Sequence, residues 1–210
     1  NQWNGVAIIS KEEPEEVFTG FPHQPGFAKD PEKPQDREAR ALGARIRGVE
    51  IWSLYIPNGR EITDRHYDYK LDFLYQLARH AAGRAQSKLL LTGDFNIAPR
   101  DEDVWDIEAF RGKTHVTEPE RAAFQMLEEV GLEEVTRRFT EDQRYTYFDY
   151  KGMRFHKNEG MRIDFQLTSA PLAKHVTGAR VDMEERAGEK TSDHCPLHAD
   201  FDLPDFDSVR

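Results

Sequence analysis

The amino-acid sequence predicts a layered α/β fold, in one domain that spans residues 1–210. Strand-like apolar runs alternate with two amphipathic helical segments, and several of these runs end in polar residues. Neither an internal repeat nor a linker divides the chain. With 210 residues, 38% of them hydrophobic, the chain is long enough for one domain with a substantial core.

The first half of the chain predicts three strands and a loop. Residues 5–10 are mostly apolar and are expected to form a buried strand. Residues 18–37 are rich in proline, glycine and charge, without periodicity, so we expect a loop. Residues 39–46 and 49–56 alternate between apolar and polar side chains across a short Arg-Gly connection, which predicts a hairpin.

Two helices have start and stop signals. Asp64 is a suitable N-cap and Gly83 a suitable end for a helix whose apolar residues recur at helical spacing, namely Tyr67, Leu71, Leu74, Ala78 and Ala81. Thr117 and Glu120 form a capping-box pattern for a second helix, with Gly131 at its end. Further strands are expected at residues 145–150, 162–169, 178–183 and 196–203.

Polar residues at the ends of four predicted strands suggest a site. Residues 89–91 are leucines, and Gly93, Asp94 and Asn96 follow them, with Asp94 and Asn96 on the same side of the chain. The other strand ends carry Tyr55 with Asn58, Asp164, and Asp193 with His194. An aspartate at a strand end is often only part of a turn, so the pattern gains weight from its repetition.

Three aspartates cannot converge without a compensating charge, because neighbouring carboxylates repel one another. A hard cation and a protonated His194 would supply that charge. Oxygen ligands of this kind suit Mg²⁺ or Mn²⁺, and the absence of a Cys/His cluster from the sequence argues against zinc.

Composition narrows the possible partners and compartment. The formal net charge of −10 argues against a protein that holds nucleic acid by bulk electrostatics. Basic residues nevertheless outnumber acids between residues 137 and 162, and this stretch could form a local basic face: Arg137, Arg138, Arg144, Lys151, Arg154, Lys157 and Arg162. Cys195, the one cysteine, cannot form an internal disulfide, and the sequence shows no membrane span or signal peptide. We therefore expect a cytoplasmic protein and, for Cys195, a small buried residue.

Four motifs carry a resemblance to a known family. They are Tyr-x-Pro-Asn at 55–58, Gly-Asp-Phe-Asn at 93–96, Arg-Ile-Asp at 162–164 and Ser-Asp-His at 192–194. In this order they resemble the exonuclease III-type apurinic/apyrimidinic (AP) endonucleases of the deoxyribonuclease I-like endonuclease/exonuclease/phosphatase superfamily. The likeness extends from residue 3 to residue 203. The second and fourth motifs are shared by the whole superfamily, whereas residues 55–59, 145–150 and 160–164 resemble its DNA-repair branch.

The resemblance implies a four-layer αββα sandwich of two mainly antiparallel sheets, with the site at one end of the sheets. Family members begin with a strand that ends in asparagine and another that ends in a metal-binding glutamate. No residue of this chain matches either position, so the N-terminal strands of the fold are expected to be missing. The chain is then either a fragment or a divergent protein with an impaired metal site.

The resemblance also assigns roles to residues. Asp94 would orient or deprotonate the attacking water, and Asn96 would position the water or the phosphate. His194, paired with Asp164, would donate to the scissile phosphate. Tyr55 would hydrogen-bond the phosphate or assist the leaving group. The metal ligands would be Asp193, Asp94 and Asn96. The DNA contacts would be Asn58, Tyr147, Arg154, Met161 and Ile163. Three of these contacts, Tyr147, Met161 and Ile163, would form an apolar pocket for a flipped sugar without a base.

The function expected from the resemblance is Mg²⁺-dependent hydrolysis of DNA phosphodiesters in base excision repair. The protein would nick duplex DNA 5′ to abasic sites and act at 3′ ends as a 3′–5′ exonuclease or 3′-phosphatase, as a monomer. Two alternatives stay open. One is a phosphatase or phosphodiesterase that acts on a small or lipid phosphate. The other is a DNA-binding remnant without catalysis, which the absent N-terminal ligands would explain.

Overall fold

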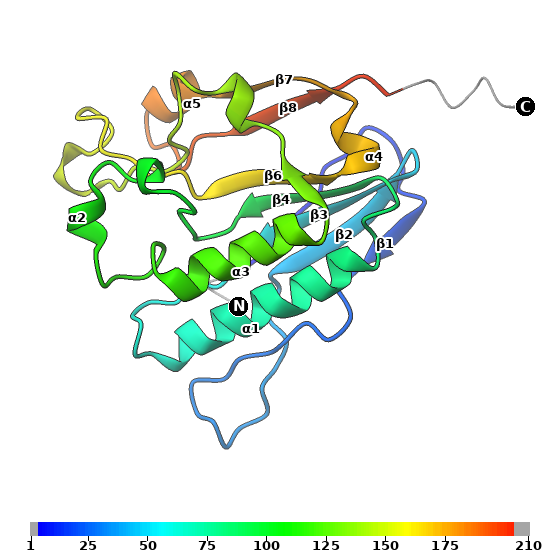
Figure 1. Ribbon diagram of the computed structural model, residues 1–210, viewed down its shortest axis with the longest axis horizontal. Helices are drawn as coiled ribbons and strands as arrows, with labels where there is room; N and C mark the ends of the chain where they lie inside the picture. Colours follow the sequence, from blue (N-terminus) through cyan, green and yellow to red (C-terminus); the bar gives the residue numbers. More distant parts are fainter. Residues whose placement is uncertain (1–3, 204–210) are drawn as a thin grey trace, which may run out of the picture.

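A computed structural model describes residues 4–203 of the chain (Figure 1). Its strands are β1 (Glu16–Phe18), β2 (Ala41–Ile46), β3 (Val49–Tyr55), β4 (Leu89–Asp94), β5 (Leu132–Glu134), β6 (Asp164–Ser169), β7 (Val176–Val181) and β8 (Leu197–Phe201). Its α-helices are α1 (Arg65–Ala82), α2 (Ile107–Phe110), α3 (Glu118–Glu129), α4 (Ala170–Ala173) and α5 (Met183–Ala187). Short 3₁₀ helices are η1 (Asp101–Asp103), η2 (Arg137–Phe139) and η3 (Lys151–Met153).

The strands form a six-stranded mixed sheet and a two-stranded sheet. The larger sheet has the order β1-β2-β3-β4-β6-β5, in which β3 and β4 run parallel and the other neighbours antiparallel. Strands β7 and β8 pair antiparallel in the second sheet. The α/β class and the mainly antiparallel pairing are therefore confirmed, since only β3 and β4 run parallel, whereas the described part of the second sheet has only two strands.

The two faces of the six-stranded sheet are covered differently. On one face, α1 and α3 pack against β3, β4 and β6 in one apolar core, which includes Trp52, Phe73, Phe124 and Phe165 (Figure 1). Side chains alternate along β6, so Gln166 points to the other face, where its Nε2 donates to the carbonyl of Leu197 on β8 at 2.9 Å. The described residues thus form a helical layer, a large sheet and a small sheet.

The predicted hairpin and both long helices are confirmed. Strands β2 and β3 pair from Ile46↔Val49, and the two residues between them have positive φ (51° at Arg47 and 71° at Gly48), as a type I′ turn requires. The Asp64 side chain caps α1 by accepting from the backbone N–H of His66. The expected capping box of Thr117 and Glu120 begins α3. Among residues 4–203, no helix is long and apolar enough to cross a membrane.

Two predicted strands are wrong. Residues 5–10 form no strand, and Ile9 is 98% exposed, so their apolar composition does not reflect burial among the described residues. Residues 145–150 form no strand because their backbone bonds divide between two segments. The N–H of Tyr147 donates to Met161, and the N–H of Phe148 donates to Asp193. Single bridges join Tyr147 to Met161 and to His194, so the stretch still connects parts of the candidate site.

Candidate active site

Three predicted site residues lie in one row across the large sheet. Tyr55 is paired with Asp94 at the ends of the parallel strands β3 and β4, and Asp94 is paired with Asp164 at the start of β6. Paired residues on neighbouring strands project to the same face, so the register brings these side chains together. Gly93 permits the close approach of β3: its φ is +138°, and a Cβ there would lie 2.0 Å from the carbonyl oxygen of Leu54.

His194 reaches this row from the segment before β8. Its Nδ1 donates to Oδ2 of Asp164 at 2.9 Å, while its Nε2 lies 4.0 Å from Oδ2 of Asp94, which is beyond hydrogen-bond distance. The Tyr147 ring packs edge-on against the imidazole, with 5.0 Å between ring centroids. Burial opposes the charged form of His194, but the hydrogen bond and charge of Asp164, with Asp94 and Asp193, raise its pKa to about 9.

Asp94 is a carboxyl group with a raised pKa. Burial and the negative charge of Asp164 raise its pKa to about 7, although the charge of His194 and the backbone N–H of Asn96 act in the opposite direction. Oδ1 of Asp94 accepts from that N–H at 2.8 Å, and Oδ2 accepts from Nδ2 of Asn96 at 2.9 Å. A carboxyl group with a pKa near neutrality is suited to take a proton from water.

Asn96 is fixed on all sides. Its φ of +52° turns the chain sharply after β4, and its Nδ2 also donates to the carbonyl of Ile56 at 3.0 Å. Its Oδ1 faces Nδ2 of Asn58 at 3.0 Å and Nε2 of His115 at 3.1 Å. Nδ2 of Asn58 donates to this oxygen, and Nε2 of His115 donates to it as well when that nitrogen carries the ring proton. Burial and the nearby Lys70 lower the pKa of His115 to about 4, so its ring is neutral at neutral pH.

Sequence reasoning did not identify His115, or the buried Lys70 whose Nζ donates to the backbone oxygen of Asn96 at 2.6 Å. His115 follows an irregular segment and belongs to none of the four motifs. Lys70 lies within a regular amphipathic helix, where a lysine is usually solvated. Only the burial of both residues beside Asn96 shows that they belong to the site.

Two of the three residues expected to form an apolar pocket line a common cavity, which charged side chains also line. Tyr147 and Met161 line a cavity of about 180 Å³ together with Trp105 and Phe110, two aromatic residues that no motif indicated. Ile163 is only 2% exposed and packs in the same apolar cluster as Met161, so it supports the pocket from behind.

Arg154 also lines this cavity. Its guanidinium lies 4.6 Å above the Trp105 ring and pairs with Glu159. The expected basic face is smaller than the sequence indicated. Arg162 has no exposed surface and donates to Thr136 and Thr140, while the partly exposed Arg137 makes two hydrogen bonds to the buried Asp103, so both already have internal partners.

Tyr55 and Asp193 lie nearby, and among the described residues no side-chain hydrogen bond defines a role for either of them. Tyr55 is half-buried at the end of β3, with the guanidinium of Arg40 4.9 Å from its ring centroid. Asp193 is half-buried, and its backbone oxygen accepts from the N–H of Phe148 at 2.8 Å. Their roles in catalysis and metal binding stay predictions.

The donor set fits a divalent cation only incompletely. Within residues 4–203, no group of three or more His, Cys, Asp or Glu side chains could hold a metal ion. Asp164 is engaged by His194, and Oδ1 of Asn96 already has two polar neighbours. Both oxygens of Asp94 accept from Asn96, and the carboxylates of Asp94 and Asp193 do not complete a site by themselves.

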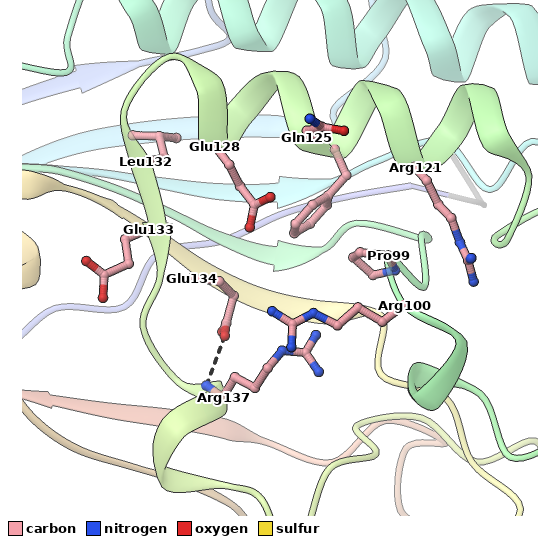
Figure 2. A pocket seen from close by; sticks show the side chains of 10 residues that line it. Pro99, Arg100, Arg121, Gln125, Glu128, Leu132, Glu133, Glu134 and Arg137 are labelled. Carbon is pink, nitrogen blue, oxygen red and sulfur yellow. Dashed lines mark hydrogen bonds between the residues drawn. The ribbon is translucent and has the colours of Figure 1, made fainter.

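A second, larger cavity is a separate feature. It has a volume of about 570 Å³ and lies between α3, β5 and the segment after β4 (Figure 2). Three arginines line it, and each already has an acidic partner in η1: Arg121 with Asp101 at 2.7 Å, Arg137 with Asp103 at 2.7 Å and Arg100 with Glu102 at 3.5 Å. Their charge is therefore neutralised internally, and none of the predicted site residues reaches this cavity.

The mixed sheet and the carboxylates and histidine at its strand ends define an α/β protein with a polar site at one edge of the sheet. Comparison with known proteins specifies the group. A family model described as the Endonuclease/Exonuclease/phosphatase family matches residues 1–194, and the chain belongs to this family. The exonuclease III-like resemblance of the sequence is confirmed.

Three relatives illustrate the similarity. Exodeoxyribonuclease III of Haemophilus influenzae is 31% identical over 209 residues, which cover 94% of this chain and 76% of that protein. The structure of the 3′ phosphatase NExo from Neisseria bound to a product DNA hairpin is 35% identical, with a TM-score of 0.82, covering 92% of this chain and 73% of NExo. An AP endonuclease from Archaeoglobus fulgidus is 31% identical, with a TM-score of 0.81 and the same coverage.

Proposed function

We propose that this chain hydrolyses phosphoester bonds of duplex DNA, at abasic sites and at 3′ ends, as a DNA-repair nuclease. The observation that carries the proposal is the arrangement of His194 between Asp164 and Asp94 at the ends of β4 and β6. The names of the relatives support the choice of substrate, since they include an exodeoxyribonuclease III, an AP endonuclease and a 3′ phosphatase bound to DNA.

The proposed reaction begins with water. Asp94 takes a proton from the water as the water oxygen attacks the phosphorus atom. The Nε2–H of His194, directed away from Asp164, donates to a non-bridging phosphate oxygen, where negative charge grows in the transition state. In nicking, exonuclease and 3′-phosphatase cleavage alike, the bond between phosphorus and the 3′-oxygen breaks, and the departing 3′-oxygen, to which the Tyr55 hydroxyl donates, takes up a proton to become a 3′-hydroxyl. Asn96 and Asn58 hold the phosphate with their amides.

Members of this family typically depend on Mg²⁺. Asp94 and Asp193 would contribute carboxylates to such a cation, which would neutralise phosphate charge, and further ligands would have to come from outside the described side chains. Proton transfer by Asp94 and hydrogen-bond donation by His194 and Tyr55 are proposed for the side chains themselves.

Recognition of DNA is proposed to use the small aromatic cavity. Tyr147 and Met161 form one wall of it, Arg154 lies at its side, and Tyr147 also contacts His194. A flipped sugar without a base would place its phosphate against His194 while its ring entered this cavity. Asn58 would contact the neighbouring phosphate.

The test compares three DNA substrates and one lipid in Mg²⁺ buffer: a duplex with an abasic site, a duplex with a 3′-phosphate, a duplex with a recessed 3′ end, and a phosphoinositide. We expect cleavage or phosphate release on at least one DNA substrate, and loss of that activity in His194→Ala. Hydrolysis of the phosphoinositide alone would establish the alternative substrate class. No turnover on any DNA would refute the proposal.

A second candidate function is DNA binding without catalysis, and the incomplete metal ligand set favours it. Fluorescence anisotropy with a labelled abasic duplex would detect binding under the same conditions. Binding that persists without turnover at millimolar Mg²⁺ or Mn²⁺ would support this candidate, whereas turnover that saturates with Mg²⁺ would eliminate it.

A further inference from the structure

A fully buried ion pair lies behind the candidate site. The side chains of Lys70 on α1 and Glu120 on α3 have no exposed surface, and Nζ of Lys70 contacts Oε1 of Glu120. Withdrawing two charges from water is unfavourable unless the pair and its remaining donors and acceptors are well bonded. The other contacts of the two groups therefore indicate what the pair does.

Lys70 joins two loops of the site. Its Nζ donates to the backbone oxygen of Asn96 at 2.6 Å and lies 3.2 Å from that of Asn58. These residues follow β4 and β3, the parallel neighbours at the centre of the large sheet. One ammonium group thus fixes the backbone behind both amides, whose side chains meet at 3.0 Å.

Glu120 fixes His115, the third residue of the polar cluster that also contains Asn58 and Asn96. Its Oε1 accepts from the backbone N–H of His115 at 2.9 Å and from the hydroxyl of Thr114 at 2.6 Å. Its Oε2 accepts from Thr117, which holds the carboxylate at the start of α3. The position of His115, whose Nε2 faces Asn96, is therefore set by the same carboxylate that neutralises Lys70.

Packing around the pair leaves little room for adjustment. Gly59 has a φ of +89°, and a Cβ there would lie 2.8 Å from Oγ1 of Thr114 and 3.2 Å from Cδ of Lys70. One turn earlier on α1, Nδ1 of His66 accepts from the N–H of Gly59 at 3.1 Å. The Asn58 loop consequently rests directly on the ion pair and on α1.

We propose that the Lys70–Glu120 pair is a positioning device that sets the relative placement of Asn58, Asn96 and His115. In the proposed hydrolysis, on which this inference rests, the pair would determine how the amides meet the phosphate without touching it. Lys70 supplies only donors and Glu120 only acceptors, so an uncharged replacement cannot reproduce both sets of contacts.

The experiment removes both charges together. In Lys70→Met/Glu120→Gln no unpaired buried charge remains, and glutamine keeps an oxygen for the capping box. Side-chain amide signals of Asn58 and Asn96 are recorded by ¹⁵N–¹H NMR, and kcat and KM are measured on a 3′-phosphorylated DNA duplex. We expect displaced or broadened amide signals and a loss of kcat of about tenfold or more with KM changed less, because small misplacements of positioning groups are costly.

A matched control is Glu50→Gln. Glu50 is also a buried, ion-paired carboxylate, but it lies at the opposite end of β3 from Tyr55. This variant is expected to unfold more easily while both asparagine signals and kcat stay unchanged. If the double variant does not fold, Thr114→Val, which removes one hydroxyl from the cluster, replaces it in the experiment. This variant should shift the side-chain amide signals of Asn58 and Asn96 by a smaller amount.

Unchanged amide signals in a folded double variant or in Thr114→Val would overturn the positioning role, as would amide signals displaced equally by Glu50→Gln. The NMR readout needs no turnover. If the wild-type protein fails to hydrolyse DNA, the proposed function is refuted, while displaced signals would still support positioning of the amides by the ion pair.

Discussion

Replacement of Asp164 by asparagine is expected to slow hydrolysis most strongly at alkaline pH. The carboxylate of Asp164 accepts from Nδ1 of His194, and its hydrogen bond and charge are the main influences that raise the pKa of His194 to about 9 against the opposing effect of burial. An amide removes that charge. The imidazole should then titrate near its ordinary pKa of 6.5, so it would lose its proton within the pH range of the assay.

The size of the effect follows from the two pKa values. With a pKa of about 9, roughly nine-tenths of His194 is charged at about pH 8, whereas with a pKa of 6.5 roughly 3% is charged, a loss of roughly 30-fold. At about pH 5.5 both forms are mostly charged, so the deficit should nearly vanish. His194→Ala lacks the donor entirely and should lose about 10²–10³ in kcat at every pH.

The assay is single-turnover hydrolysis of a DNA substrate between about pH 5.5 and 9 at saturating Mg²⁺, with ¹H NMR titration of the imidazole as a second measurement. Because the two residues act together, Asp164→Asn/His194→Ala should be scarcely slower than His194→Ala alone. A deficit in Asp164→Asn that does not depend on pH, or strictly additive losses in the double variant, would refute the reasoning.

Three further predictions concern stability, each measured by urea unfolding. Burial opposes ionisation of Glu50, but hydrogen bonds from His80 and Trp52 and the charge of Arg84 lower its pKa from 4.5 to about 2. This carboxylate should therefore contribute about 3 kcal/mol to the free energy of unfolding above pH 4.5, and the contribution should be lost as the pH falls toward 2. Glu50→Gln should make the free energy of unfolding depend less on pH in this range, and an unchanged pH dependence would contradict the prediction. Gly93→Ala should destabilise by about 3 kcal/mol or more, because its φ is positive and Leu54 blocks a Cβ; a loss below about 1 kcal/mol would contradict this. Thr117→Ala should cost about 1 kcal/mol through the lost cap of α3, and an unaffected midpoint would count against that cap.

Elements encoded by neighbouring residues could be predicted from the sequence. The cap of α1 at Asp64 and the capping box of α3 each depend on residues within three positions, and the Arg47–Gly48 turn determines its own hairpin. The ends of β4 and β6 could also be predicted, since alternation fixes which side chains share a face. The pairing of Asp94 with Asp164 on neighbouring strands is a long-range contact, and its expectation came from the family resemblance rather than from local rules.

Features that depend on distant partners could not be predicted. Lys70 and Glu120 are fifty positions apart in the sequence, and only their docking shows that both charges are buried. Arg162 looked like a surface cation because its partners, Thr136 and Thr140, precede it by more than twenty residues. Residues 145–150 have the composition of a strand, but their partners lie on two different segments, which prevents a continuous ladder.

The parallel pairing of β3 and β4 has a consequence for how the site comes into existence. Parallel neighbours require a crossover, here α1, so the two asparagine loops meet only after that helix has docked on the sheet. His194 arrives from a segment far along the chain and binds Asp164. No hairpin or helix pair contains the site in advance, so such long-range contacts close late in folding. The candidate site is therefore complete only when the whole sheet has formed.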